Sequence, residues 1–96
     1  MKVDLDFDFV VGREETHTVS FHWRQFWGVA DVEVDGTSVY HERHPFGMKV
    51  TRRYEFSVGR LEVHSVLIEK TRPLVAGGIR KQAVKVFVDQ ELVGEY

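Results

Sequence analysis

The feature that most constrains this chain is a strict alternation of apolar and polar residues. Between residues 2 and 11 every odd position is apolar, and Lys2, Asp4, Asp6 and Asp8 occupy even positions. A period of two is typical of a β-strand with one buried face and one face in water. The alternation returns at 16–24, 29–34 and 79–88, and no segment shows a sustained helical period. The sequence therefore predicts an all-β protein.

Turn signals divide the chain into about seven to eight short strands. Asp35-Gly36 is the strongest signal, because both residues tolerate the positive φ angles of a two-residue hairpin turn. Strands are expected at about 2–11, 16–24, 29–34, 37–43, 61–70, 79–88 and 91–96, and on both sides of a turn within 46–58. Short strands joined mainly by hairpins predict an antiparallel β-sandwich.

Two irregularities are expected within these strands. Arg52 interrupts the apolar face of 46–58, which predicts a hairpin turn near Thr51-Arg52-Arg53. The apolar phase of 61–70 shifts near His64-Ser65, which predicts a β-bulge.

Composition limits the classes of protein to which the chain can belong. Its 96 residues fit a single domain, 1–96, with a modest core. A net charge of −2 gives no overall attraction to nucleic acid or to an anionic membrane. The chain has no cysteine, which excludes disulfides and thiol chemistry, and it shows neither a signal-peptide pattern nor a membrane-spanning apolar run. We expect a soluble, cytoplasmic protein that binds neither nucleic acid nor membrane.

Charge is distributed unevenly along the chain. Residues 1–35 carry three basic and eight acidic side chains, whereas residues 36–88 carry ten basic and four acidic ones. This pattern fits a mixed surface whose strands pair acid with base. It also fits a bipolar surface that docks a protein partner or a second copy of the chain.

The two halves of the sequence show a weak similarity to each other. His17-Thr18-Val19 precedes Val32-Glu33-Val34-Asp35-Gly36, and His64-Ser65-Val66 precedes Val86-Phe87-Val88-Asp89-Gln90. Because the spacing differs between the halves, two sheets built by the same strand rules are favoured over a true duplication.

Several of these strand residues occur in an order that carries a family resemblance. The pattern comprises His17-x-Val19-x-Phe21, Gly28, Val32-x-Val34-Asp35-Gly36, Phe56-x-Val58-Gly59, and Val84-x-Val86-x-Val88-Asp89 followed by Leu92. Over about residues 5–93 the chain resembles the N-terminal domain of the Fas apoptotic inhibitory molecule family. The resemblance implies a β-sandwich without enzymatic activity that acts through protein partners.

The chain departs from that family in two ways. The family protein has two such domains, and this chain has the length of one. The turn after the second strand is small and polar in the family, but here it reads Arg24-Gln25-Phe26-Trp27. No functional residue is therefore carried over from the family.

The residues that most often perform chemistry show no catalytic or metal-binding pattern. His41 and His44 are three apart, so on a strand they face opposite sides and do not clamp one metal ion. Asp4, Asp6 and Asp8 share one strand face, which reads as a charged outer surface rather than an acid–base pair. We expect no enzyme, no metal and no cofactor.

Two groups of residues are binding candidates. The first is the aromatic turn, with Arg24, Phe26 and Trp27 beside Trp23, since aromatics next to arginine are typical of interface hot spots and sugar-stacking platforms. The second is basic: Lys70, Arg72, Arg80 and Lys81. Each has a plain alternative, namely aromatics that cap one end of the sandwich and basic residues that are simply solvated.

These observations leave two functional hypotheses. The first is a non-enzymatic protein-interaction domain that binds a protein partner or a second copy through the Trp27 turn and the basic residues Lys70, Arg72, Arg80 and Lys81. The alternative is a small-ligand or carbohydrate binder that uses Trp23 and Trp27 as a stacking platform.

Overall fold

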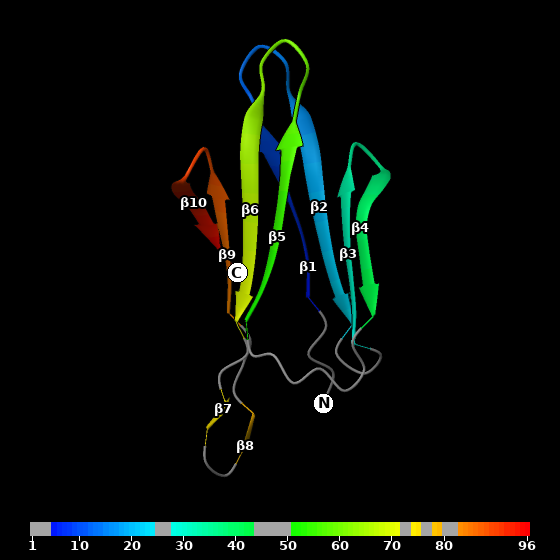
Figure 1. Ribbon diagram of the computed structural model, residues 1–96, viewed down its shortest axis with the longest axis vertical. Helices are drawn as coiled ribbons and strands as arrows, with labels where there is room; N and C mark the ends of the chain where they lie inside the picture. The colour runs from blue at the N-terminus through cyan, green and yellow to red at the C-terminus, as the bar shows by residue number, and fades with distance from the viewer. Residues whose placement is uncertain (1–4, 25–27, 44–50, 72–73, 76–77, 80–82) are drawn as a thin grey trace.

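The protein is a sandwich of two antiparallel sheets, shown in Figure 1. The computed structural model describes residues 5–24, 28–43, 51–71, 74–75, 78–79 and 83–96. The first sheet has the order β1 (Leu5–Val11), β2 (His17–Arg24), β3 (Val29–Val34) and β4 (Thr37–Arg43). The second sheet has the order β10 (Glu91–Glu95), β9 (Ala83–Val88), β6 (His64–Thr71) and β5 (Thr51–Val58). A small separate hairpin consists of β7 (Leu74–Val75) and β8 (Gly78–Ile79).

The core lies between the two sheets and follows from the alternation in the sequence. In β2, Val19, Phe21 and Trp23 are buried, and the residues between them face outward. The other buried apolar residues are Val11, Ala30, Val32, Tyr54, Val58, Val66, Ile68, Val84 and Val86. These residues come from both sheets, so the apolar faces cover each other, which confirms the predicted β-sandwich.

Aromatic contacts tie the sheets together. The ring of Phe21 in the first sheet lies 5.9 Å from that of Tyr54 in the second. At one edge, Phe7 of β1 stacks on Tyr96 at 3.8 Å. At the other edge, the Tyr40 hydroxyl donates a 2.8 Å hydrogen bond to the carbonyl of Glu55. The two sheets are therefore joined at their centre and at both edges.

The Asp35-Gly36 hairpin turn predicted from the sequence is confirmed, since both residues have positive φ angles of 51° and 83°. The equivalent turn in the second sheet is Asp89-Gln90, with φ angles of 51° and 69°. These turns connect β3 to β4 and β9 to β10.

Two sequence predictions about irregularities are wrong. The segment 51–58 forms one continuous strand, in which Arg52 pairs with Lys70, so no turn interrupts it. Strand β6 has no bulge at His64-Ser65, and its register with both neighbours is regular. The apparent phase shift arose because Leu61 and Val63, which are 97% and 60% exposed, precede the strand. The irregularities occur instead between Val32 and Glu33 and between Leu92 and Gly94.

The two sheets are built in the same way. In each, a hairpin of two long strands is followed by a third and a fourth strand, so that β1, β2, β3 and β4 correspond to β5, β6, β9 and β10. The connection 72–82, which contains β7 and β8, is longer than the equivalent connection 25–28 of the first half. This difference explains why the similar segments are spaced differently in the two halves of the sequence.

Candidate functional site

The loops at one end of the sandwich carry a repeated pattern, Gly-Arg-x-Glu-x-His, at 12–17 and 59–64. Figure 1 shows both loops side by side at the top of the view. Gly12 and Gly59 have nearly the same φ, 105° and 104°, which L side chains rarely adopt. The conformational role of each glycine is therefore the same in the two halves.

Each loop glutamate binds the backbone of the opposite loop. The Glu15 carboxylate accepts hydrogen bonds from the amides of Arg60, Leu61 and Glu62 at 2.8, 2.7 and 3.2 Å. The Glu62 carboxylate in turn accepts from the amides of Arg13, Glu14 and Glu15 at 2.8, 2.9 and 3.4 Å. We call this reciprocal arrangement the loop clamp. It satisfies backbone donors that a turn would otherwise leave to water.

A histidine sits between two carboxylates in each half of the clamp. The Nε2 atom of His17 lies 2.6 Å from Glu15, and its Nδ1 lies 2.5 Å from Asp35. His64 contacts Glu62 and Asp89 in the same way, at 2.5 and 2.6 Å. A ring with an acceptor at each nitrogen is best satisfied as the imidazolium, which donates from both.

The contacts shift the pKa values of these groups in opposite directions. The hydrogen bond from His17, followed by those from the amides of Leu61 and Arg60, lowers the pKa of Glu15 to about 2. The Glu15 carboxylate, followed by that of Asp35, raises the pKa of His17 above its ordinary value.

The second half of the clamp has the same electrostatics. The hydrogen bond from His64 is the main cause that lowers the pKa of Glu62 to about 2. Asp89 and then Glu62 raise the pKa of His64. Both ring nitrogens of His17 and of His64 are held by carboxylates, so neither histidine is placed to activate a nucleophile. The clamp is therefore assigned a structural role.

The clamp predicts how stability depends on pH. A histidine pKa raised above 6.5 stabilises the fold at low pH, and this stabilisation is lost as pH rises through the folded-state pKa. The Glu15 and Glu62 pKa values fall from 4.5 to about 2, so their stabilisation is present above pH 4.5 and is lost as pH falls toward 2. We expect the melting temperature to be highest between these limits, near pH 5–6, and to decline above neutral pH.

Melting curves from acidic to alkaline pH check this prediction. The control is the double variant His17→Gln/His64→Gln, in which the decline on the alkaline side should flatten. A parent protein that is as stable at pH 9 as at pH 6 would contradict the imidazolium assignment.

The outer faces of the two sheets can be compared position by position because the halves are equivalent. On the first sheet one row across the strands reads Asp6, His22, Asp31 and His41. The next row reads Asp8, Ser20, Glu33 and Ser38. These two rows are polar and include four acidic residues, with the Asp6 carboxylate 2.6 Å from Nδ1 of His22.

The corresponding rows of the second sheet have a different chemistry. The first reads Arg53, Glu69, Lys85 and Glu95, so that charge alternates from strand to strand. The second reads Glu55, Leu67, Phe87 and Leu92. Three apolar residues thus occupy the places held by Ser20, Glu33 and Ser38 on the first sheet, and we call them the apolar row.

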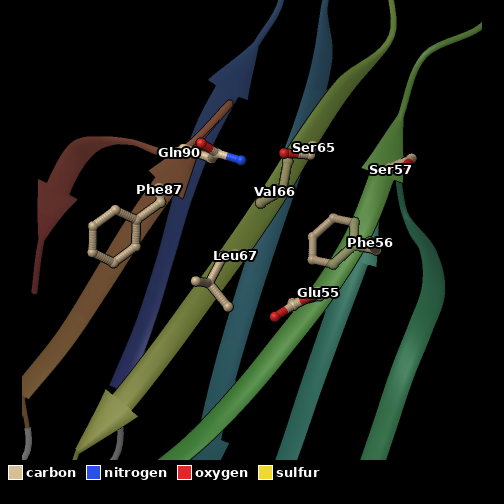
Figure 2. Close-up of a pocket in the computed structure, with 8 residues that line it drawn as sticks. All are labelled: Glu55, Phe56, Ser57, Ser65, Val66, Leu67, Phe87 and Gln90. Atoms are coloured by element: carbon tan, nitrogen blue, oxygen red, sulfur yellow. The ribbon is translucent and has the colours of Figure 1, made fainter.

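A hollow of about 570 Å³ lies over this row. Figure 2 shows Leu67 and Phe87 projecting from neighbouring strands, with Glu55 beyond Leu67 on β5. The lining residues are Glu55, Phe56, Ser57, Ser65, Val66, Leu67, Phe87 and Gln90. Its floor is therefore apolar and its surroundings include hydroxyl, amide and carboxylate groups, a composition suited to binding.

Sequence reasoning missed this row although a signal for it was present. In β6 and β9 the inward positions are Val66, Ile68, Val84 and Val86. Leu67 and Phe87 are therefore apolar residues at positions where the alternation calls for a polar side chain. The inward faces of these strands are already apolar. A further apolar residue at an outward position is therefore the sequence signal that could have indicated the apolar row.

The aromatic candidates from the sequence are only partly described. Arg24 is half-exposed, and its guanidinium donates a 2.8 Å hydrogen bond to Asp6 on the outer face of the first sheet. Phe26 and Trp27 lie outside the described residues. Trp23 is 6% exposed and belongs to the core, so it does not form an exposed stacking platform.

Of the basic candidates, Lys70 alone lies in the part of the chain that the structure describes. Lys70 is 4% exposed, and its ammonium lies 3.6 Å from the ring centroid of Trp23. It alternates with Val66 and Ile68 on the inward face of β6, where its long stem packs in the core and its charge lies over an aromatic ring. Arg72, Arg80 and Lys81 lie outside the described residues.

The acidic and histidine candidates have plain structural surroundings. Asp6 and Asp8 are exposed on β1, as predicted, whereas Asp4 and His44 lie outside the described residues. Within the described ranges no three His, Asp or Glu side chains are grouped so that they could hold a metal ion. The described part of the chain also has no helix long and apolar enough to cross a membrane.

Comparisons of this chain with protein-family models, with curated proteins and with solved structures found no match.

Proposed function

We propose that this protein is a non-enzymatic binding module that contacts another protein through the outer face of its second sheet. One observation carries the proposal: Leu67, Phe87 and Leu92 form an apolar row where the equivalent row of the first sheet is polar. Both sheets have the same strand order and the same clamp, so the fold itself does not require apolar residues at these outward positions. Exposed apolar surface with a polar rim is typical of protein interfaces.

The surroundings of the row favour a protein over a small ligand. Arg53, Glu69 and Lys85 lie one row away and offer charged groups of both signs. Leu92 is 47% exposed and extends the apolar surface beyond the hollow toward the sheet edge. An extended apolar strip beside mixed charges suits the broad contact of a protein partner. The resemblance noted in the sequence points to the same class of function, and the proposal does not depend on it.

The carbohydrate alternative has less support. It relied on Trp23 and Trp27 as a joint platform, and Trp23 is in the core. The hollow over Leu67 carries one aromatic ring on its outward side, that of Phe87. A sugar site would be expected to present a flat exposed aromatic face with polar groups beside it.

Site-specific cross-linking tests the proposed surface. A photoreactive phenylalanine analogue is placed at Leu67 on the second sheet, and in a control at Ser20, the equivalent outward position on the first sheet. Irradiation in cells of the source organism should give protein adducts from position 67 and few from position 20. Equal labelling from the two positions, or no adduct from either, would refute the proposed surface.

A further inference from the structure

We infer that the partner for this face is a second copy of the chain, which packs its second sheet against the same sheet about a twofold axis parallel to the strands. The inference rests on the proposed function and adds the identity and geometry of the partner. It is carried by the order of charges across the second sheet: Arg53, Glu69, Lys85 and Glu95 alternate in sign along one row.

A twofold axis along the strands, placed between β6 and β9, reverses the order of every row. Arg53 then faces Glu95 of the other copy, and Glu69 faces Lys85. All four charges of the row meet an opposite charge, and the twofold repeats each contact. A self-complementary patch of this kind is what an isologous dimer requires.

The same rotation brings apolar residues onto apolar residues. The row Glu55, Leu67, Phe87 and Leu92 is reversed as well, so Leu67 of one copy faces Phe87 of the other. These two residues lie on the central strands β6 and β9, so the contact is at the middle of the interface. Glu55 and Leu92 face each other at the rim, where the carboxylate remains in water. The arrangement has the apolar centre and polar rim of a specific interface.

The first sheet does not offer an equivalent surface. Its second row, reversed on itself, opposes Ser20 to Glu33 and Asp8 to Ser38, with no apolar contact. Its first row reversed opposes Asp6 to His41 and His22 to Asp31, again with no apolar contact. The second sheet is therefore the face that offers both an apolar centre and alternating charges to a copy of itself.

The size of the face indicates the class of interface to expect. Four strands about 4.8 Å apart, with about six residues each at about 3.3 Å, present roughly 400 Å² in projection. Specific complexes bury about 800 Å² per partner, so a contact of this size belongs with the small, transient interfaces. The association is accordingly expected to appear only at high concentration.

Charge reversal followed by mixing provides the test. In the Glu69→Lys variant, the introduced lysine would face Lys85 of the other copy, and the twofold axis repeats this contact. In the Lys85→Glu variant, the introduced glutamate would face Glu69 of the other copy in the same way. Sedimentation equilibrium should show at least tenfold weaker association for each variant alone, because like charges are brought together. An equimolar mixture should recover the parental association. Between unlike chains the introduced lysine faces the introduced glutamate, and the unaltered Lys85 and Glu69 face each other as in the parent.

Two further comparisons keep the test independent of effects on folding. The control for charge reversal is Asp31→Lys, at the position of the first sheet that corresponds to Lys85, and it should leave association unchanged. The second comparison is Leu92→Lys against Leu92→Glu, both on an exposed edge residue. Because this side chain faces Glu55 across the axis, the lysine variant should dimerise more tightly than the glutamate variant.

The outcomes separate this inference from the proposed function. A chain that stays monomeric up to about 1 mM refutes the dimer. If position 67 then yields adducts with a different protein, the binding face stands and its partner is not a second copy. Association that survives both charge reversals lies on another surface and also overturns the inference. Recovery by the mixture alone, with monomeric single variants, supports it.

Discussion

Replacing Gly59 with alanine is expected to destabilise the protein by about 3 kcal/mol or more, a large share of the stability of a domain this size. Gly59 has a φ of 104°, and a Cβ atom there would lie 2.0 Å from the carbonyl oxygen of Glu62. That oxygen belongs to the backbone of the loop clamp, so it cannot move aside as a side chain would. The substitution should displace the loop and weaken the hydrogen bonds from this loop to Glu15.

The matched control is Gly36→Ala in the hairpin turn between β3 and β4. Gly36 also has a positive φ, 83°, but a Cβ atom there would have nothing within 4 Å. It should cost about 1 kcal/mol, the usual penalty of a non-glycine residue in this conformation. Urea denaturation of both variants measures the difference. Equal stabilities for Gly59→Ala and Gly36→Ala would mean that the loop is not held as tightly as the clamp requires.

Truncation of Phe21 to alanine should cost about 3–5 kcal/mol, because it opens a cavity at the centre of the core. Phe21 is fully buried, and its ring lies 5.3 Å from Phe7 and 5.9 Å from Tyr54. Its loss therefore removes packing within the first sheet and between the sheets. Thermal and urea unfolding should both show the effect.

The comparison variant is Phe87→Ala, which removes the same side chain from the outer face of the second sheet. Phe87 is partly exposed, so its truncation should cost only about 1 kcal/mol of stability. It should nevertheless weaken association strongly, because the ring lies at the centre of the proposed interface. If Phe87→Ala destabilises the monomer as much as Phe21→Ala does, the row is structural and the proposed binding face is wrong.

The alternation in the sequence predicted most of the fold because a strand with one buried face leaves a direct record in residue order. The inward positions of β2 and β3 were identified correctly, from Val19 to Val32. The Asp35-Gly36 turn was equally accessible, since few residues tolerate its backbone angles. Arg52 led to a wrong prediction because a charged residue at an inward position looks like a chain reversal, although it pairs with Lys70 within a continuous strand.

The loop clamp could not be predicted because its contacts join residues far apart in the chain. Glu15 and Glu62 are 47 positions apart, and nothing local in either loop shows that they exchange hydrogen bonds. The repeated Gly-Arg-x-Glu-x-His pattern indicates that the two loops are equivalent, although it does not show their contacts. It strengthens the interpretation of the two halves as an internal repeat. Equivalent side-chain contacts occur in both halves: His17 contacts Asp35, and His64 contacts Asp89. Two sheets that merely follow the same rules of strand formation would not need to share these contacts.

The candidate binding face was not predicted, because its evidence is a difference between two equivalent sheets. Leu67 and Phe87 are out of phase with the alternation in the sequence, but that they form one row where the other sheet is polar is seen only beside Ser20 and Glu33. That comparison needs the register of both sheets. The sequence placed the binding candidates on turns instead, where an exposed aromatic or a group of arginines is visible without knowledge of strand pairing.

The most direct test of the central claim is a concentration series of amide NMR spectra of the unmodified protein. If the outer face of the second sheet is the contact surface, resonances from Leu67, Phe87 and Lys85 should shift progressively as concentration rises. Resonances from Ser20, at the equivalent position on the first sheet, should stay in place. Chemical-shift changes confined to the first sheet would contradict the proposed contact surface. It would also be contradicted if neither sheet showed changes with concentration and cross-linking from position 67 also gave no partner.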